Sequence, residues 1–335
     1  MSAFADLLTR WGPKPSGPTL LLNTDDPDVA GALACSRQAQ AFQCHFRHES
    51  HQAYEREGET VPCFFPEIPT TPYQHVFWGW PKAKEEAGML LHWLSCVMAS
   101  DGQLWLLGPN KGGIKSAPKM LTQQGWRVSK VGSARHCVLL KATPPSTVEP
   151  FALEAYWRKV PLPGSDAVLW SLPGVFSHGR IDKGSQQLLP WLRDLPSPVL
   201  DFGCGAGLLS LALAQNQAST AFTGIDHHWL AILSARQTAK TNGLDFSAHW
   251  TDGLTDVTGQ YAGLITNPPF HTGLSINYEI TRSMIAGSER LLTPGAQWLA
   301  VVNDHLPYAE WLKQSFADIT CLQHERGFKI WRAIR

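Results

Sequence analysis

The second half of the chain alternates short, β-rich hydrophobic runs with stretches whose apolar residues recur at helical spacing. The β-rich runs lie at 199–202, 221–226, 246–251, 262–266 and 297–302. The stretches with helical spacing lie between them, at 207–215, 229–242 and 277–292, and we expect Pro294-Gly295 to end the last helix. Two more β-rich runs, 319–323 and 328–334, flank a turn that contains Gly327, which predicts an antiparallel hairpin at the sheet edge. This order predicts an α/β fold with a doubly wound, seven-stranded mixed sheet.

The first half repeats the last part of this pattern. A helical stretch at 83–99 leads into the apolar run 103–107, as the stretch 277–292 leads into the run around Trp298, and Trp105 and Trp298 lie 298 − 105 = 193 positions apart. Each run is followed by a helix and a closing pair of strands. A repeat with so long a period is typical of duplicated structural units, so we expect two tandem Rossmann-like domains.

A segment rich in proline and small residues separates the two halves. Such a composition is typical of a linker and not of the interior of a helix or strand. The segment also contains the aromatic residues Phe151, Tyr156, Trp157 and Trp170, so we expect it to pack on a domain surface. We therefore predict three parts, residues 1–145, 146–172 and 173–335.

The charge balance gives little indication of a partner. The chain has 28 Lys and Arg and 28 Asp and Glu, so no net field attracts a polyanion to the molecule as a whole. The stretch 111–141 contains seven basic residues and no acidic one. This stretch predicts either a patch that contacts nucleic acid or a solvated basic face, with equal weight. The first five of its basic residues are Lys111, Lys115, Lys119, Arg127 and Lys130.

Cysteine usage and hydropathy exclude several classes of protein. The seven cysteines are scattered and include no C-x-x-C pair, which disfavours a disulfide framework and a zinc site and fits a reducing cytosol. No spacing among the 13 histidines suits a metal site, so we expect no metal. No apolar run approaches the ~20 residues of a membrane helix, and the N-terminus lacks the pattern of a signal peptide. We expect a cytoplasmic protein that contacts no membrane.

A glycine-rich sequence, Asp201-Phe202-Gly203-Cys204-Gly205-Ala206-Gly207, joins the strand at 199–202 to the following helix. Glycines at such a junction let the chain turn sharply and present backbone amides to a ligand. A dinucleotide fingerprint would need its last glycine at Leu208, so an NAD site is disfavoured. The sequence predicts a cofactor site formed by Asp201, Gly203, Cys204, Gly205 and Gly207, and the alternative is a turn that binds nothing. The first half has no glycine directly after its run at 19–22, so we expect that copy to bind no cofactor.

Two acidic residues lie at the ends of the next two predicted strands, Asp226 as the last residue of one and Asp252 directly after the other. Asp226 lies 226 − 207 = 19 positions after the last glycine, where a carboxylate can accept hydrogen bonds from both hydroxyls of a ribose. Its alternative role is to cap the following helix. Asp252 could bind an adenine amine, although Asp252-Gly253 is also a common turn. We predict that both residues bind the nucleoside part of a cofactor.

The sequence Asn267-Pro268-Pro269-Phe270 follows the strand at 262–266, at the edge where parallel sheets bind ligands. The side-chain oxygen of Asn267 and the backbone carbonyl of Pro268 can accept both protons of an exocyclic NH2 group. Pro269 adds stiffness to this loop, and Phe270 can stack on a base. The alternative is a simple turn. The first half offers only Trp78-Gly79-Trp80-Pro81, which lacks the carboxamide, so we expect catalysis in the second half.

These motifs resemble those of the class I amino-methyltransferases. Together with Pro173-Gly174-Val175-Phe176-Ser177, Asp182-Lys183-Gly184-Ser185 and His271-Thr272-Gly273, they are similar over the full length to the bacterial ribosomal RNA small subunit methyltransferase C family. The resemblance implies two tandem class I methyltransferase domains, of which the N-terminal copy is degenerate. It implies methyl transfer from S-adenosylmethionine to the exocyclic N2 amine of a guanine in 16S rRNA, within the assembled 30S subunit. It also implies that Phe176, Asp182 and Gly184 approach the cofactor, whereas the residues alone indicate a polar loop there.

Several alternatives remain open on the motifs alone, because they indicate only methylation of a planar amine. A guanine of large-subunit rRNA, a DNA adenine or a protein glutamine would fit the same motif. Outside the enzymes, the alternative is a ribosome-assembly or RNA-binding factor that keeps this fold without turnover. An intact glycine turn in the same half as Asn267 disfavours that alternative. We expect a monomer whose N-terminal copy helps to hold RNA.

Overall fold

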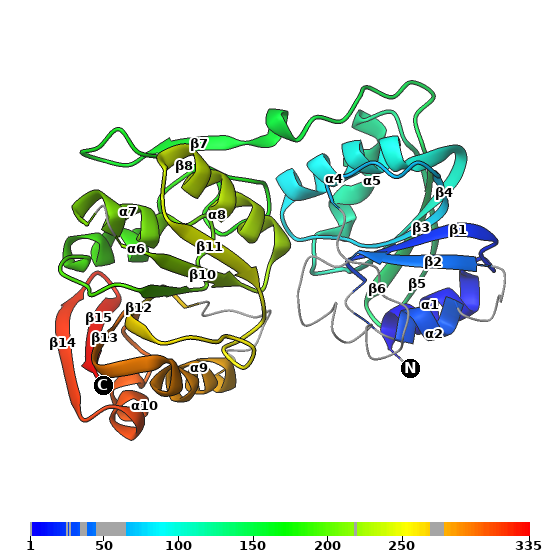
Figure 1. The fold of residues 1–335 in the computed structure, drawn as a ribbon. Coiled ribbons are helices and arrows are strands. Elements are labelled where there is room, and N and C mark those ends of the chain that lie inside the picture. Colours follow the sequence, from blue (N-terminus) through cyan, green and yellow to red (C-terminus); the bar gives the residue numbers. More distant parts are fainter. Residues whose placement is uncertain are drawn as a thin grey trace. The chain divides into compact units, whose positions relative to one another are not determined.

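The computed structural model describes residues 2–24, 26, 28–33, 39–44, 65–217, 220–268 and 278–335 (Figure 1). The chain divides into two compact units, Met1–Tyr156 and Trp157–Arg335. Each unit contains one large mixed β-sheet with helices on both of its faces (Figure 1). We refer to them as unit 1 and unit 2.

Unit 1 contains a six-stranded sheet in the order β2-β1-β3-β4-β6-β5. The strands from β2 to β4 pair in parallel, whereas β6 is antiparallel to both β4 and β5. Helices α1 and α2 cover one face of this sheet and α4 and α5 the other (Figure 1). The elements are α1 (Ala3–Trp11), β1 (Gly17–Leu22), α2 (Asp28–Leu33), β2 (Ala39–Cys44), β3 (Tyr73–Gly79), α4 (Lys84–Val97), β4 (Met98–Pro109), η1 (Ile114–Ser116), α5 (Ala117–Gln123), β5 (Arg127–Ala134), β6 (Cys137–Thr143) and η2 (Leu153–Tyr156).

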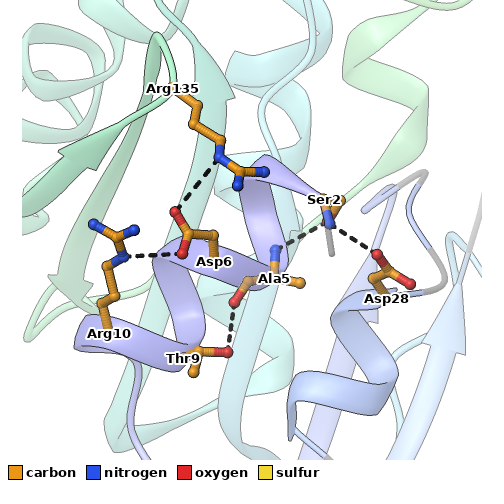
Figure 2. Close-up of polar contacts among 7 residues, drawn as sticks. All are labelled: Ser2, Ala5, Asp6, Thr9, Arg10, Asp28 and Arg135. Carbon is orange, nitrogen blue, oxygen red and sulfur yellow. Dashed lines mark hydrogen bonds and ion pairs between the residues drawn. The ribbon is translucent and has the colours of Figure 1, made fainter.

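Polar contacts fix helix α1 within unit 1 (Figure 2). Ser2 caps the helix by accepting a hydrogen bond from a backbone N–H of the first turn at 3.1 Å, and its own N–H donates to Asp28 of α2 at 2.8 Å. The buried Asp6 carboxylate accepts from Arg10 Nε at 2.9 Å and pairs with Arg135 Nε at 3.8 Å. Because Arg135 lies between β5 and β6, these contacts join α1 to α2 and to the antiparallel edge of the sheet.

Unit 2 contains a seven-stranded sheet in the order β11-β10-β9-β12-β13-β15-β14, as expected. The strands from β11 to β13 are parallel, and β15 is antiparallel to β13 and β14. Helices α6, α7 and α8 lie on one face, and α9 and α10 on the other (Figure 1). The elements are β7 (Arg158–Pro161), β8 (Val168–Ser171), α6 (Lys183–Leu188), η3 (Leu189–Trp191), β9 (Val199–Phe202), α7 (Leu208–Asn216), β10 (Phe222–Asp226), α8 (Trp229–Asn242), β11 (Phe246–Trp250), β12 (Tyr261–Thr266), α9 (Tyr278–Leu291), β13 (Leu292–Asn303), α10 (Tyr308–Ser315), β14 (Asp318–Glu325) and β15 (Phe328–Ile334).

The two large sheets repeat one another, including their irregularities. Without β11, the order in unit 2 matches that of unit 1 strand by strand. A register shift interrupts the β3–β4 pair between Tyr73 and His75, and another interrupts the β12–β13 pair between Tyr261 and Gly263. The hairpins β5–β6 and β14–β15 each carry one further shift in the outer strand. Bulges at matching positions are what a duplicated fold would retain, so the predicted duplication is confirmed.

The alignment of the two copies nevertheless differs from the one that the tryptophans indicated. The registers equate Gln103 with Gln297, and therefore Trp105 with Leu299 instead of Trp298. Successive residues of a strand point to opposite faces, so Trp105 and Trp298 occupy opposite faces of their sheets. Both tryptophan rings are nevertheless buried. Helices cover both faces of each sheet, so a side chain is buried whichever face it points to.

Helix α9 was expected over 277–292 and spans Tyr278–Leu291, three positions short of Pro294, but the strand that follows starts earlier than the expected residue 297. Strand β13 begins directly at Leu292. Gly295 lies in the irregular first part of β13, where it adopts a φ of +80° and its N–H donates to the carbonyl of Arg335 at 2.7 Å. The Pro-Gly pair therefore lies in an irregular part of β13 that is hydrogen bonded to Arg335, the residue after β15.

The segment predicted as a packed linker contains a small hairpin, β7–β8. Along β8 and at the residue after it, backbone N–H groups of the alternate residues 168, 170 and 172 donate to Asn242, Thr238 and Ser234 at 3.0, 3.0 and 3.1 Å. These three acceptors are spaced four residues apart and so lie on one face of α8. These side chains accept the backbone hydrogen bonds that a neighbouring strand would otherwise accept, and they fix the hairpin to the surface of unit 2.

Candidate active site

The glycine turn between β9 and α7 forms one side of the site. Gly203, Gly205 and Gly207 all have positive φ angles, of +67°, +54° and +85°. Such angles favour glycine because other residues would place a Cβ against the backbone. A Cβ built on Gly205 would meet nothing within 4 Å, so this part of the turn faces open space. Cys204 has a different environment: it is 6% exposed, and burial raises the pKa of its thiol. Its side chain is therefore neutral and packed in the core.

Asp226, at the end of β10, is hydrogen bonded to this turn. Its Oδ2 accepts from the N–H of Gly205 at 3.0 Å, and its Oδ1 accepts from the N–H of His228 at 2.9 Å. The side chain is half-buried, and burial raises its pKa. The backbone N–H of His227 also hydrogen bonds to this carboxylate, so three of its roughly four lone pairs are in use and about one remains for a ligand.

Asp201 lies in β9 and is 1% exposed. Its Oδ2 accepts from the hydroxyl and the N–H of Ser210 at 2.6 and 3.3 Å, which ties the first turn of α7 to the strand. Its Oδ1 has no hydrogen-bond partner among the described residues. Burial raises the pKa of this carboxyl to about 7.

Asn267 directly follows β12, next to the strand that carries the glycine turn. Thr266 pairs with Phe202 of β9, and its hydroxyl donates to the carbonyl of Phe202 at 2.8 Å. The Asn267 carboxamide donates through Nδ2 to Asp182 Oδ2 at 3.1 Å and to Ser185 Oγ at 2.9 Å. Thus the structure brings together Asn267 and Asp182, which were predicted separately.

The segment before β9 contributes the other predicted residues. Asp182 caps α6 by accepting from the N–H of Ser185 at 2.9 Å. A Cβ on the buried Gly184 would lie 3.0 Å from both the ring of Phe328 and Asp182 Oδ2, so a larger residue would require these side chains to shift where α6 approaches β15. Phe176 is 67% exposed, which leaves its ring available for contact.

The remaining predicted residues are Asp252, the three residues after Asn267 and five basic residues of unit 1. Asp252 is exposed after β11. Pro268 is buried, whereas Pro269 and Phe270 lie outside the described residues. The five basic residues predicted to contact RNA are all exposed and are distributed from the turn after β4 through α5 to β5: Lys111, Lys115, Lys119, Arg127 and Lys130.

Ser185 and Ser210 were missed by the sequence analysis. Ser185 stands three positions after Asp182, which is the spacing of an N-cap contact and could have been recognised. Ser210 stands nine positions after Asp201 and has no comparable signal, because the pairing depends on how the helix folds back on the strand.

In unit 1, the residue that corresponds to Asn267 is a glycine packed against the backbone of a neighbouring loop. The strand registers equate Gly79 with Asn267 and Asn23 with Gly203. A Cβ on Gly79 would lie 1.8 Å from the carbonyl oxygen of Asn23. The strand end that carries Asn267 in unit 2 therefore carries, in unit 1, a glycine in close contact with the loop after β1.

Metal binding and membrane insertion have no support in the described residues. Within them, no group of three or more His, Cys, Asp or Glu side chains could hold a metal ion. No helix among them combines the length and apolarity needed to cross a bilayer.

A parallel sheet closed by an antiparallel hairpin, with a glycine turn after its first strand and an Asn-Pro loop after its fourth, is the arrangement of a class I methyltransferase. The family description "Methyltransferase small domain" matches residues 166–332, and "Methyltransferase small domain N-terminal" matches residues 7–160. This protein belongs to the ribosomal RNA small subunit methyltransferase C family.

Relatives of that name support this assignment over most of the chain. The protein from Shewanella sp. (strain MR-4) is 32% identical over 93% of this chain and 92% of its own length. The protein from Photobacterium profundum is 37% identical over 76% of this chain and 75% of its own. A solved structure, the T. thermophilus 16S rRNA N2 G1207 methyltransferase in complex with AdoMet and guanosine, matches with a TM-score of 0.85 at 21% identity, over 100% of this chain and 92% of that one.

Proposed function

We propose that this protein transfers the methyl group of S-adenosylmethionine to the exocyclic N2 amine of a guanine in 16S rRNA. The observation that carries the proposal is the Asn267 carboxamide, held by two hydrogen bonds at the strand end beside the glycine turn. The family, whose members are named for small-subunit rRNA, supports the choice of substrate.

The described residues fit S-adenosylmethionine. Open space over Gly205 lets a ligand approach the backbone of the turn closely. The half-buried Asp226 would accept from a ribose hydroxyl through its remaining lone pair, and it already orients the N–H of Gly205. We propose that Gly203, Gly205 and Gly207 support the methionine part. Five further residues complete this proposed cofactor set: Asp201, Cys204, Asp252, Phe176 and Gly184. The side chains of Asp201 and Cys204 are buried, so these two residues would support the glycine turn instead of contacting the cofactor through their side chains.

The acceptor side of the site is formed by Asn267 and Pro268. Asn267 Oδ1 and the Pro268 carbonyl would each accept one hydrogen bond from the guanine NH2, so that the lone pair of its nitrogen points away from both. The cofactor supplies an electrophilic methyl group on a sulfonium. As the N–C bond forms, positive charge develops on the nitrogen, and both acceptors then bind its protons more strongly than in the ground state.

No general base is needed for this reaction. The nitrogen is cationic after transfer and strongly acidic, so one of its two protons can leave to water past the Asn267 oxygen. Phe270 would stack on the guanine, a role that rests on the residue pattern alone.

We further propose that the substrate is the assembled 30S subunit, that the enzyme acts as a monomer, and that it works in the cytoplasm, where ribosomal subunits are found. In unit 1, the exposed basic residues would contact phosphates, which supply most of the affinity of RNA-binding surfaces. A neutral chain needs such a local patch, since its overall field is balanced.

Replacing Asn267 by alanine tests the mechanism. The variant should bind S-adenosylmethionine as the wild type does, because the glycine turn and Asp226 are untouched, but methyl transfer to 30S subunits should fall by about 100-fold or more. Methyl transfer at the wild-type rate would defeat the proposed role of this residue.

A further inference from the structure

The amide group of Asn267 has both of its N–H bonds engaged within the protein. One hydrogen bond goes to Asp182 Oδ2 at 3.1 Å and the other to Ser185 Oγ at 2.9 Å. Ser185 is 5% exposed, so at least one of these bonds is shielded from water. A carboxamide has two N–H donors, and none is left over for a substrate.

These contacts decide which way the carboxamide faces. An ionised carboxylate only accepts hydrogen bonds, so Asp182 favours the orientation that turns Nδ2 toward it. Rotating the amide by 180° would bring Oδ1 against the carboxylate oxygen, with two acceptors in contact and both donors lost. The oxygen of Asn267 is therefore directed away from α6, and a carboxylate on the donor side polarises the amide and strengthens that oxygen as an acceptor.

Helix α6 is itself held in place from the opposite side. Gln323 of β14 donates through Nε2 to Gln187 Oε1 at 3.0 Å, and its Oε1 accepts from Trp191 Nε1 at 3.0 Å. Gly184 packs close to Phe328 of β15. The edge hairpin thus fixes the short helix that presents Asp182 and Ser185 to Asn267.

We infer that Asp182 and Ser185 are positioning residues that hold the Asn267 carboxamide with its oxygen toward the guanine amine. This inference rests on the proposed function, and it assigns Asp182 to the substrate side of the site, whereas the resemblance implies an approach to the cofactor. Both residues act through Asn267. Their effect should consequently appear in kcat, and not in the affinity for S-adenosylmethionine or for RNA.

Three substitutions of Asp182 separate positioning from helix capping, because a single oxygen, Oδ2, serves both Ser185 N–H and Asn267 Nδ2. Asp182→Asn keeps an acceptor for both donors and removes only the charge. Asp182→Ser keeps a good N-cap but is too short to reach Asn267, and Asp182→Ala removes both contacts. Gln186→Ala, an exposed change on the same helix, is the matched control.

Steady-state methyl transfer to 30S subunits should then distinguish the variants. We expect kcat to fall about 10- to 100-fold in Asp182→Ser and Asp182→Ala, and to stay within roughly threefold of the wild type in Asp182→Asn. KM for 30S subunits and the Kd for S-adenosylmethionine should not change in any of them. The melting temperature should fall only in Asp182→Ala, and Ser185→Ala should lower kcat in the same direction as Asp182→Ser.

A double-mutant cycle completes the test. If Asp182 acts through Asn267, Asp182→Ser should cause no further loss in an Asn267→Ala background. Wild-type kcat in Asp182→Ser, together with an inactive Asn267→Ala, would overturn the positioning role and leave the proposed function standing. Full activity of Asn267→Ala itself would overturn both.

Discussion

Asp201→Asn isolates the energetic consequence of burying a carboxyl group at the start of the glycine turn. Burial raises the pKa of Asp201 from 3.8 to about 7, although the hydrogen bonds from Ser210 act in the opposite direction. A folded-state pKa above the unfolded one means that the folded protein holds the proton more tightly. The resulting stabilisation is complete below pH 3.8 and is lost as the pH rises through about 7. The full shift corresponds to about 4 kcal/mol, of which about 3 kcal/mol is lost between roughly pH 5 and pH 8.

Urea unfolding of the full chain at intervals across that pH range measures this effect. Asparagine keeps an oxygen that can accept from Ser210 but cannot ionise, so the titration of all other groups cancels in the comparison. The free energy of unfolding of the wild type should fall relative to that of Asp201→Asn by about 3 kcal/mol as the pH rises from roughly 5 to 8. Parallel curves for the two proteins would refute the reasoning, because they would mean that Asp201 is already ionised at the acidic end.

Three further predictions concern the cofactor, unit 1 and RNA. Asp226→Ala should weaken S-adenosylmethionine binding at least about 10-fold in calorimetry, whereas the exposed Asp252 should tolerate alanine with a smaller loss, and the reverse order would contradict the assignment of the ribose contact. Gly79→Ala should lower the free energy of unfolding by about 2 kcal/mol or more, since its Cβ would lie 1.8 Å from a carbonyl oxygen. The control Gly31→Ala, which has open space around it in helix α2, should raise the free energy of unfolding by about 0.5–1 kcal/mol. Equal effects of the two substitutions in denaturant titrations would argue against the close contact. Alanine at all five basic positions should weaken RNA binding and flatten its salt dependence in filter-binding assays, with Lys84→Ala as a control on α4, and an unchanged salt slope would place the RNA surface elsewhere; the five are Lys111, Lys115, Lys119, Arg127 and Lys130.

Most of the architecture could be predicted because its signals are local. Helix α8 was expected at 229–242 and has those bounds, since its apolar spacing is regular and Gly243 ends it with a φ of +66°. The antiparallel hairpin at the edge followed in the same way from two β-rich runs around Gly327. Local signals also identified the glycine turn, because its three positive φ angles require glycine.

Register and long-range contacts could not be predicted in this way. Aligning Trp105 with Trp298 gave an offset of 193, one less than the strand pairing has, because side-chain identity in a strand buried on both faces does not fix register. The contact of Asn267 with Asp182 spans 85 positions, so each residue could be recognised by its own motif but the hydrogen bond between them could not. The early start of β13 could not be predicted for a related reason, because the positive φ of Gly295 accompanies a hydrogen bond to Arg335 at the end of the chain.

The identity of the methylated atom tests the proposed function most directly. Purified protein should be incubated with isotopically labelled S-adenosylmethionine and 30S subunits from cells that lack this gene, and the rRNA then digested to nucleosides and analysed by mass spectrometry. We expect label in N2-methylguanosine of 16S rRNA, present with the wild type and absent with Asn267→Ala. Label in another nucleoside, in 23S rRNA or in protein, or no transfer by a protein that binds S-adenosylmethionine, would contradict the proposed function.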